Sequence, residues 1–215
     1  MLVLKDARLV FLANPKTATQ SLRAALSPFA AATPEGTGDK HINAPTYARK
    51  WARAVRAAVG AECETFAVMR EPLEHLGSWY RYRQREALRG HENSTHGLTF
   101  AQFVEARLTP DPPPFARIGR QDRFLGFLDG GPAVHHIFDY AQMEKLVAFL
   151  DERIGARLVV PHRNISPKGA DQALSLPKDL RERLWDLHAT EFELYDRVRQ
   201  AGVLYTPGAP ASAVD

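Results

Sequence analysis

Residues 9–21 join an unbroken apolar run to a short turn and then to the start of a helical pattern. The run occupies residues 9–13, a Pro-Lys-Thr turn follows at 15–17, and hydroxyl and amide side chains lead on to Ser21. A loop between a strand and a helix N-terminus aims backbone N–H groups and the positive end of the helix dipole at one point, where an anion binds. Lys16 adds a full positive charge there. The segment therefore predicts a strand that feeds an anion-holding loop.

Short apolar runs alternate with helical patterns along the chain. We expect strands at Leu9–Ala13, Thr65–Met69, Val134–Phe138 and Arg157–Val160. We expect helices at Gln20–Leu26, Thr46–Val59, Leu73–Arg89, Phe100–Arg107, Ala141–Ile154 and Pro177–Gln200. This alternation is typical of an α/β fold in which a central parallel sheet is flanked by helices. Ligands bind such a sheet at the edge where its strands end.

Length and composition indicate one folded unit. With 215 residues, of which 45% are hydrophobic, the chain is long enough to bury a substantial core. No internal repeat or second domain is visible. We expect a single domain over residues 1–205 and a disordered tail over residues 206–215.

Charge and cysteine content limit the partners and the compartment. The 28 basic residues are interspersed with 25 acidic ones and the formal net charge is +3, so composition does not predict a nucleic-acid partner. No run approaches the roughly 20 apolar residues of a membrane span, and the start of the chain lacks the pattern of a signal peptide. The single cysteine, Cys63, excludes an intramolecular disulfide and a cysteine-based metal cluster. We expect a cytoplasmic protein.

A second polar pair follows the next buried run. Arg70 ends the apolar segment, Pro72 suits a helix start, and Ser78 lies about a turn and a half into that helix. Arg70 and Ser78 can thus share one phosphate. Each residue has another interpretation when it is considered alone. Lys16 can be a solvated lysine in a turn, Arg70 can form a structural salt bridge, and Ser78 can be an ordinary serine in a helix. Their joint occurrence in this order favours anion binding.

These residues resemble the motifs of one enzyme family. The loop is not that of nucleoside triphosphatases, because Gly-x-x-x-x-Gly-Lys-[Ser/Thr] is required there and residues 9–21 contain no glycine. It is similar to the Pro-Lys-[Ser/Thr]-Gly-Thr-[Thr/Ser] loop of sulfotransferases that use 3′-phosphoadenosine 5′-phosphosulfate (PAPS), with Ala18 and Gln20 as departures. Arg70 and Ser78 match that family's Arg and Ser eight positions apart. The likeness is to the carbohydrate-type group, and its layout extends through Arg120-Gln121-Asp122 to Asn164-Ile165-Ser166, covering most of residues 9–168.

The resemblance implies a donor, a fold and a set of roles. The fold is a P-loop-NTPase-like sheet flanked by helices, and the donor is PAPS, bound without a metal ion. Lys16 binds the 5′-phosphosulfate and also stabilises the negative charge that develops during transfer. The 5′ end is bound by Lys16, Thr17, Ala18, Thr19, Gln20 and Ser21, the 3′-phosphate by Arg70 and Ser78, and Arg163 completes the pocket or belongs to a capped turn. We expect a negative φ at Ala18, because its Cβ replaces a glycine.

The general base is left open between several side chains. The resemblance favours a histidine or glutamate between the two phosphate motifs, and His41 occupies that region. The pKa of imidazole suits proton abstraction near neutral pH. A surface histidine without chemistry is the alternative for His41, and His75 and Glu74 compete for the role. The other histidines do not match a zinc signature, so we expect no metal.

Three functions compete. The favoured one is transfer of a sulfuryl group from PAPS to a hydroxyl-bearing acceptor, a carbohydrate or a small alcohol. A nucleotide-dependent phosphotransferase is the nearest rival, although it needs a glycine-rich loop and Mg²⁺ ligands. A catalytically inactive module that holds a nucleotide or an anionic glycan is the third. Trp79 and Tyr82 supply either packing or a wall on which a sugar stacks, and we expect acceptor contacts from Glu92–Leu98 and Thr109–Arg117.

Overall fold

The fold is built on a five-stranded sheet. In this computed structural model the described residues are 1–31, 41–127, 131–161 and 174–207. The strands lie in the order of the chain: β1 (Leu2–Leu4), β2 (Leu9–Phe11), β3 (Glu64–Met69), β4 (His136–Asp139) and β5 (Val203–Tyr205). The inner three run parallel, whereas β1 and β5 pair antiparallel with β2 and β4. The α/β class is confirmed, but the sheet is mixed.

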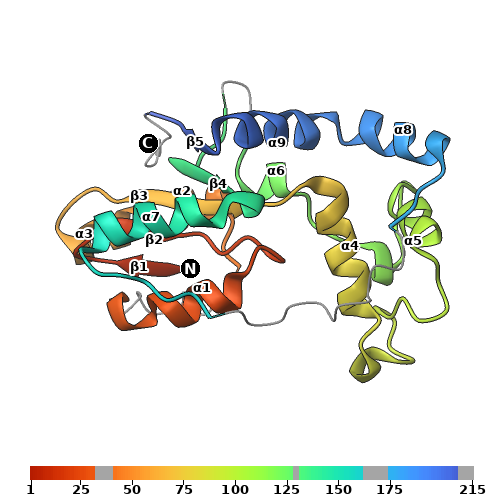
Figure 1. Cartoon of the computed structure of the whole chain (residues 1–215), viewed down its shortest axis with the longest axis horizontal. Coiled ribbons are helices and arrows are strands. Elements are labelled where there is room, and N and C mark those ends of the chain that lie inside the picture. Colours follow the sequence, from red (N-terminus) through yellow and green to blue (C-terminus); the bar gives the residue numbers. More distant parts are fainter. Residues whose placement is uncertain (32–40, 128–130, 162–173, 208–215) are drawn as a thin grey trace.

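Helices surround the sheet and extend beyond it (Figure 1). The α-helices are α1 (Thr19–Leu26), α2 (Ala44–Lys50), α3 (Ala52–Val59), α4 (Pro72–Arg83), α5 (Phe100–Arg107), α6 (Gln121–Phe124), α7 (Met143–Ile154), α8 (Lys178–Leu187) and α9 (Ala189–Ala201). Short 3₁₀ helices are η1 (Ser27–Phe29), η2 (Glu86–Leu88), η3 (Pro114–Ala116) and η4 (Tyr140–Gln142).

Both faces of the sheet are covered. Phe11, Phe66 and Phe138 pack on one face with leucines of α1 and α7. Val10 and Ile137 pack on the other face with residues of α2, α3 and α9. Strands β2 and β4 are buried over their whole length, which explains why β2 is a continuous apolar run and why β4 has no alternation of buried and exposed residues.

A third apolar cluster lies beyond the sheet. Tyr80 of α4 packs against Phe100 and Phe103 of α5, and Leu180 of α8 and Phe192 of α9 join them. Figure 1 shows α4 leading away from the end of β3 toward α5 and α8, while α9 and α8 run along both parts of the molecule. The carboxyl ends of the parallel strands therefore face a helical layer that starts with α4.

Two sequence-based expectations of strands and helices were wrong. Residues 157–160 are not a strand: Leu158 packs into the core and its N–H donates to Asp151 Oδ1, while Val159 is 80% exposed. The outer strand next to β4 is β5, and β1 was not expected at all. The long helices expected over 46–59 and 177–200 are each broken in two, at Trp51 and at His188, where φ is near −120°.

Two further expectations bear on the ends of helices and of the chain. The helix that begins at Pro72 ends at Arg83, before the expected Arg89. Most of the expected tail, residues 208–215, lies outside the described residues. Within the described ranges, no helix is both long and apolar enough to cross a membrane.

Candidate anion-binding site

The loop after β2 is held by buried polar groups. Asn14 is 1% exposed, and its Nδ2 donates to the carbonyl oxygen of Val68 on the neighbouring strand at 2.9 Å. The buried Thr17 donates its hydroxyl proton to the carbonyl oxygen of Asn14 at 2.8 Å. Because the hydroxyl proton of Thr17 is donated to Asn14, Thr17 Oγ1 shapes the loop, and the donor that this residue offers an anion is its backbone N–H.

The backbone of this loop takes the left-handed conformation twice. Lys16 has φ 64° and Ala18 has φ 57° with ψ 25°, whereas Thr17 between them is outside this region. The expectation of a negative φ at Ala18 is therefore wrong. A residue with a Cβ loses about 1–2 kcal/mol in this conformation, which glycine adopts freely. Ala18 thus holds a backbone conformation that favours glycine, at an energetic penalty.

Alternating φ signs have a consequence for ligand binding. When left- and right-handed residues alternate, successive N–H groups turn toward one point and form a concave anion site. Helix α1 starts directly after Ala18, with no side chain capping its start and no acidic residue in its first turn. Of the three polar residues that follow Ala18, Thr19 and Ser21 are buried and Gln20 is exposed. The positive end of the helix dipole thus adds to the attraction that the loop has for an anion.

Lys16 lies against an aromatic pair on α4. Its Nζ is 3.1 Å from the ring centroid of Tyr82 and 4.5 Å from that of Trp79. The two rings meet edge to face, with centroids 6.0 Å apart. The negative faces of aromatic rings attract an ammonium group. The aromatic pair therefore fixes the position of the lysine charge beside the loop.

Arg70 ends β3 at the same edge of the sheet. Its side chain is 15% exposed, its Nη2 pairs with Glu74 Oε2 at 2.8 Å, and its guanidinium stacks 4.6 Å from the ring centroid of Tyr140. Among the described residues, neither Nε of Arg70 nor Nε1 of Trp79 has a hydrogen-bond partner, although both atoms are buried, and the same holds for Nε of Arg107. Buried N–H groups in folded proteins are almost always paired. The N–H groups of Arg70 and Trp79 are therefore donors whose hydrogen bonds are unmade in the described structure.

Ser78 lies on the face of α4 that meets the loop. The helix begins at Pro72 and its first turn is capped by Glu71, which accepts from the N–H of Glu74. His75, Trp79 and Tyr82 contact the loop residues, and Ser78 shares their face because positions three and four apart lie side by side on a helix. Ser78 therefore lies on the same side of α4 as the residues that contact the loop.

The two candidate histidines contact the loop in different ways. His41 is exposed, and its Nδ1 is 2.7 Å from the carbonyl oxygen of Ala13. Because a carbonyl only accepts, Nδ1 carries the proton and neutral His41 has its basic lone pair on Nε2. His75 is buried, with Nε2 bound to the carbonyl oxygen of Pro15. Burial lowers the pKa of His75 to about 4, so it is neutral at pH 7.

A buried glutamine joins the two anion-binding points, a contact that the sequence did not reveal. Gln121 Oε1 accepts from Asn14 Nδ2 at 3.1 Å and from the N–H of Arg70 at 3.0 Å. Its Nε2 donates to the carbonyl oxygen of Arg70 at 2.8 Å. Gln121 is 0% exposed. The sequence carries one signal for Asn14, a polar residue directly after an apolar run, and Gln121 was marked only by its place in the Arg120-Gln121-Asp122 segment of the family layout.

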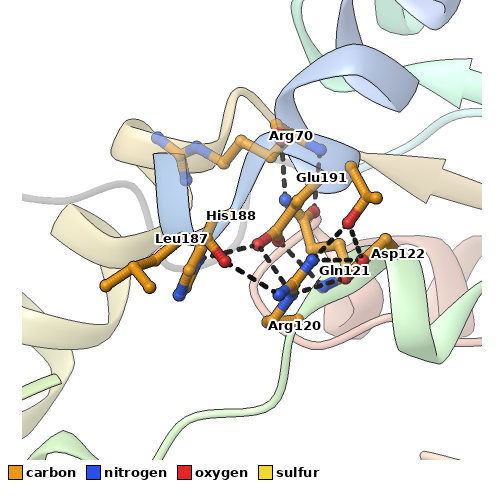
Figure 2. A network of polar contacts seen from close by, with 8 residues as sticks. Arg70, Arg120, Gln121, Asp122, Leu187, His188 and Glu191 are labelled. Atoms are coloured by element: carbon orange, nitrogen blue, oxygen red, sulfur yellow. Dashed lines mark hydrogen bonds and ion pairs between the residues drawn. The ribbon is translucent and has the colours of Figure 1, made fainter. Parts of the chain in front are cut away.

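The support of Gln121 continues into α9 (Figure 2). Glu191 Oε1 accepts from the N–H of Gln121 at 2.8 Å, and Glu191 Oε2 is 3.3 Å from His188 Nδ1. Burial alone raises the pKa of Glu191, but the bond from His188, the electrostatic interaction with His75 and the bond from the Gln121 N–H outweigh it and hold the pKa below its usual value. The carboxylate stays ionised inside the protein.

Next to this glutamate lies a buried ion pair. Arg120 and Asp122 pair through two hydrogen bonds, and Thr190 of α9 donates to Asp122 Oδ2 at 2.9 Å. Arg120 also donates to the carbonyl oxygen of Leu187, which ties the segment before α6 to the end of α8. In Figure 2 the side chain of Arg70 points away from this network, which Arg70 enters through its backbone. The guanidinium of Arg70 makes its contacts outside this network, with Glu74 and Tyr140.

Both segments expected to contact an acceptor are bound to α4. Tyr80 Oη donates to the carbonyl oxygen of Leu98 at 2.6 Å, and Arg83 Nη1 donates to that of Pro114 at 2.7 Å. The Arg83 guanidinium is also 5.3 Å from the ring centroid of Trp79. The helix that carries Ser78 thus positions residues 92–98 and 109–117 as well.

Other predicted features lie elsewhere. Arg163 and the Asn164–Ser166 motif are outside the described residues. Two surface hollows, of about 380 Å³ between α5 and α8 and about 320 Å³ beside β1 and η1, are lined by neither Lys16 nor Arg70. Within the described part of the chain, no group of three or more His, Cys, Asp or Glu side chains is arranged to hold a metal ion.

Comparison of this chain with family models, with curated proteins and with solved structures found no match.

Proposed function

We propose that the protein is a PAPS-dependent sulfotransferase with a sulfotransferase-type fold, acting on a hydroxyl-bearing acceptor such as a carbohydrate or a small alcohol. The observation that carries the proposal is the junction at Gln121. Through it, the loop with Lys16 and the strand end with Arg70 meet at one edge of the sheet. PAPS carries a phosphate on the 3′ oxygen and a phosphosulfate on the 5′ oxygen of its ribose, and two linked cationic points suit such a molecule.

The buried donors support an anionic ligand. Arg70 Nε and Trp79 Nε1 have no acceptor within the described part of the chain, and leaving a buried donor unpaired costs about 1–3 kcal/mol. Phosphate or sulfate oxygens supply such acceptors. The positive φ values at Lys16 and Ala18 add converging N–H groups of the kind that bind anions. The residues present therefore fit the donor that the sequence resemblance implies.

The side chains suggest a division of roles. PAPS supplies the sulfuryl group, with an adenosine bisphosphate as the leaving group. In the proposal Arg70 and Ser78 hold the 3′-phosphate, and the loop from Lys16 to Ser21 holds the 5′ end. His41 takes the acceptor proton at Nε2, the nitrogen left basic by the bond from Nδ1 to Ala13. Lys16, placed by Tyr82 and Trp79, stabilises negative charge that develops on the departing oxygen.

A binding experiment separates this proposal from its rivals. Calorimetry would compare 3′,5′-adenosine bisphosphate with ATP in the presence of Mg²⁺. We expect micromolar binding of the bisphosphate, weakened by about ten- to a hundredfold in Arg70→Ala through loss of a charge-assisted contact. The exposed Arg181 of α8 provides the control Arg181→Ala, which leaves affinity unchanged. Preference for ATP with Mg²⁺ would favour a phosphotransferase instead.

Transfer itself needs a second measurement. The protein is incubated with PAPS and a panel of sugars and alcohols, and products are detected by the mass of one added sulfuryl group. His41→Gln is expected to abolish transfer and to keep bisphosphate affinity. Binding without transfer to any acceptor in the panel would favour the inactive module, and full transfer by His41→Gln would remove His41 from the mechanism.

A further inference from the structure

We infer that Gln121 is a positioning residue that sets the spacing between the two anion-binding points, an inference that rests on the proposed function. Its side chain lies between the residue that precedes the Pro-Lys-Thr loop and the residue that ends β3. It binds Asn14 on one side and both backbone groups of Arg70 on the other. Gln121 is fully buried, so it acts on a ligand only through these neighbours.

The amide of Gln121 has only one orientation that satisfies its surroundings. Asn14 Nδ2 and the N–H of Arg70 are both donors and both face Oε1, while the carbonyl oxygen of Arg70 faces Nε2. If the amide were turned over, Nε2 would face two other donors, Asn14 Nδ2 and the N–H of Arg70. Oε1 would then face another acceptor, the carbonyl oxygen of Arg70. The Asn14 amide is itself oriented by its bond to Val68. The contact therefore defines both distance and direction.

The segment that carries Gln121 is itself held rigidly. Glu191 accepts from its N–H, and Arg120 and Asp122 on either side are paired with each other and bonded to α8 and α9. Buried networks of this kind specify one arrangement when every member is satisfied. Gln121 therefore holds both the loop after β2 and the end of β3 in position.

A spacing role makes a prediction that a purely structural role does not. A ligand with two anionic groups gains affinity from both only if the two sites have the right separation, because binding of one end then raises the effective concentration of the other. A ligand with one such group is insensitive to that separation. Loss of positioning should therefore weaken 3′,5′-adenosine bisphosphate much more than adenosine 5′-monophosphate or 3′-monophosphate.

The test uses Gln121→Glu, which keeps the size of the side chain and replaces the donor Nε2 by an oxygen facing the Arg70 carbonyl. We expect the affinity for the bisphosphate to fall about tenfold or more, while that of each monophosphate changes less than about twofold. Gln200→Glu, the same exchange at an exposed position of α9, is the control and should change none of the three. Thermal unfolding is followed in parallel, so that binding is measured on folded protein.

Asn14→Ala is the second variant, should Gln121→Glu not fold. It removes one of the two connections and leaves Gln121 bound to Arg70, so the same selective loss is expected to be smaller. Equal weakening of all three ligands, or an unchanged bisphosphate affinity in a folded variant, would overturn the inference. If wild-type protein does not bind the bisphosphate at all, the proposed function fails, and the positioning role fails with it. If wild type binds and the variants bind equally well, only the positioning role fails.

Discussion

His75 Nε2 lies 3.1 Å from the carbonyl oxygen of Pro15, so the helix that follows β3 holds the loop that follows β2. The acceptor is a carbonyl, which means that Nε2 must carry the proton. His75 is 3% exposed and is therefore poorly placed to meet a substrate. We assign it the role of a loop support, which leaves His41 and Glu74 as candidates for the base.

His75 predicts a pH-dependent stability. Its pKa is lowered by burial from 6.5 to about 4, so the unfolded chain binds a proton at this residue before the folded chain does. Stability is then lost as the pH falls from about 6.5 to about 4, at up to about 1.4 kcal/mol per pH unit from this group. Urea unfolding at a series of pH values checks this. In His75→Gln, which can still donate to Pro15, the free energy of unfolding should depend less steeply on pH between about 4 and 6.5. An equally steep dependence contradicts the assignment.

Ala18→Gly should stabilise the protein. The φ of 57° is strained for alanine and not for glycine. Removing this strain should raise the free energy of unfolding by about 1 kcal/mol, after allowance for the greater conformational entropy of glycine in the unfolded chain. Ala24→Gly, inside α1, is the matched control and should destabilise by about 0.5–1 kcal/mol. Denaturant unfolding of both variants gives the answer. Similar destabilisation by both would show that the backbone at position 18 is relaxed.

Trp79→Phe should weaken nucleotide binding and leave the fold intact. The exchange keeps an aromatic ring beside Lys16 and removes the buried, unpaired Nε1–H. A hydrogen bond to a charged acceptor contributes about 1.5–3 kcal/mol, which corresponds to a loss of about tenfold or more in affinity for 3′,5′-adenosine bisphosphate. Trp185→Phe, at a half-exposed tryptophan of α8, should have no effect. Equal affinities for wild type and Trp79→Phe would place the indole outside the ligand site.

Glu74→Gln should strengthen the same binding. Glu74 is 58% exposed and its carboxylate is 2.8 Å from the guanidinium of Arg70, where it competes with an anionic ligand. Exposed pairs contribute at most about 1 kcal/mol, so a gain of about two- to fivefold is expected. The control Glu182→Gln alters another exposed pair four residues apart on a helix, with Lys178. Loss of turnover in Glu74→Gln without a gain in affinity would instead identify Glu74 as the base.

Glu191→Gln should lower the free energy of unfolding by about 2–3 kcal/mol, because the buried charged carboxylate and the hydrogen bonds that it makes are lost. The carboxylate binds the Gln121 N–H and pairs with His188, and its side chain is 5% exposed. Glu193→Gln, at an exposed position of the same helix, is the control and should change little. Thermal unfolding of the two variants distinguishes them. A melting temperature equal to wild type would mean that the Glu191 charge is not needed.

Sequence reasoning worked where local pattern determines structure. The runs that became β2, β3 and β4 are apolar because helices cover both faces of the sheet, and position 70 directly follows β3 as expected. Residues 157–160 were misassigned because a short apolar run after a helix resembles a strand. In the structure Leu158 and Val160 pack against the core, Val159 is exposed, and the segment pairs with none of the described strands.

The remaining features of the site depend on contacts between distant parts of the chain. Gln121 meets Arg70 across 51 positions and Glu191 across 70, so no local pattern reveals them. The positive φ at Ala18 also escaped prediction, because intrinsic preference argues against it. Thr17, Asn14 and His75 impose that loop shape through buried hydrogen bonds, and tertiary contacts override the preference.

The antiparallel outer strands have a consequence for protein engineering. β1 and β5 come from opposite ends of the described chain and occupy opposite edges of the sheet, with three strands between them. Neighbouring strands are about 4.8 Å apart, so the two edges are separated by roughly 19 Å. In a circularly permuted version, the chain between the end of β5 and the start of β1 must contain at least about six extended residues, those that follow Tyr205 included. A shorter connection would pull an outer strand from the sheet, and loss of β5 would loosen α9, which carries the Glu191 that binds Gln121.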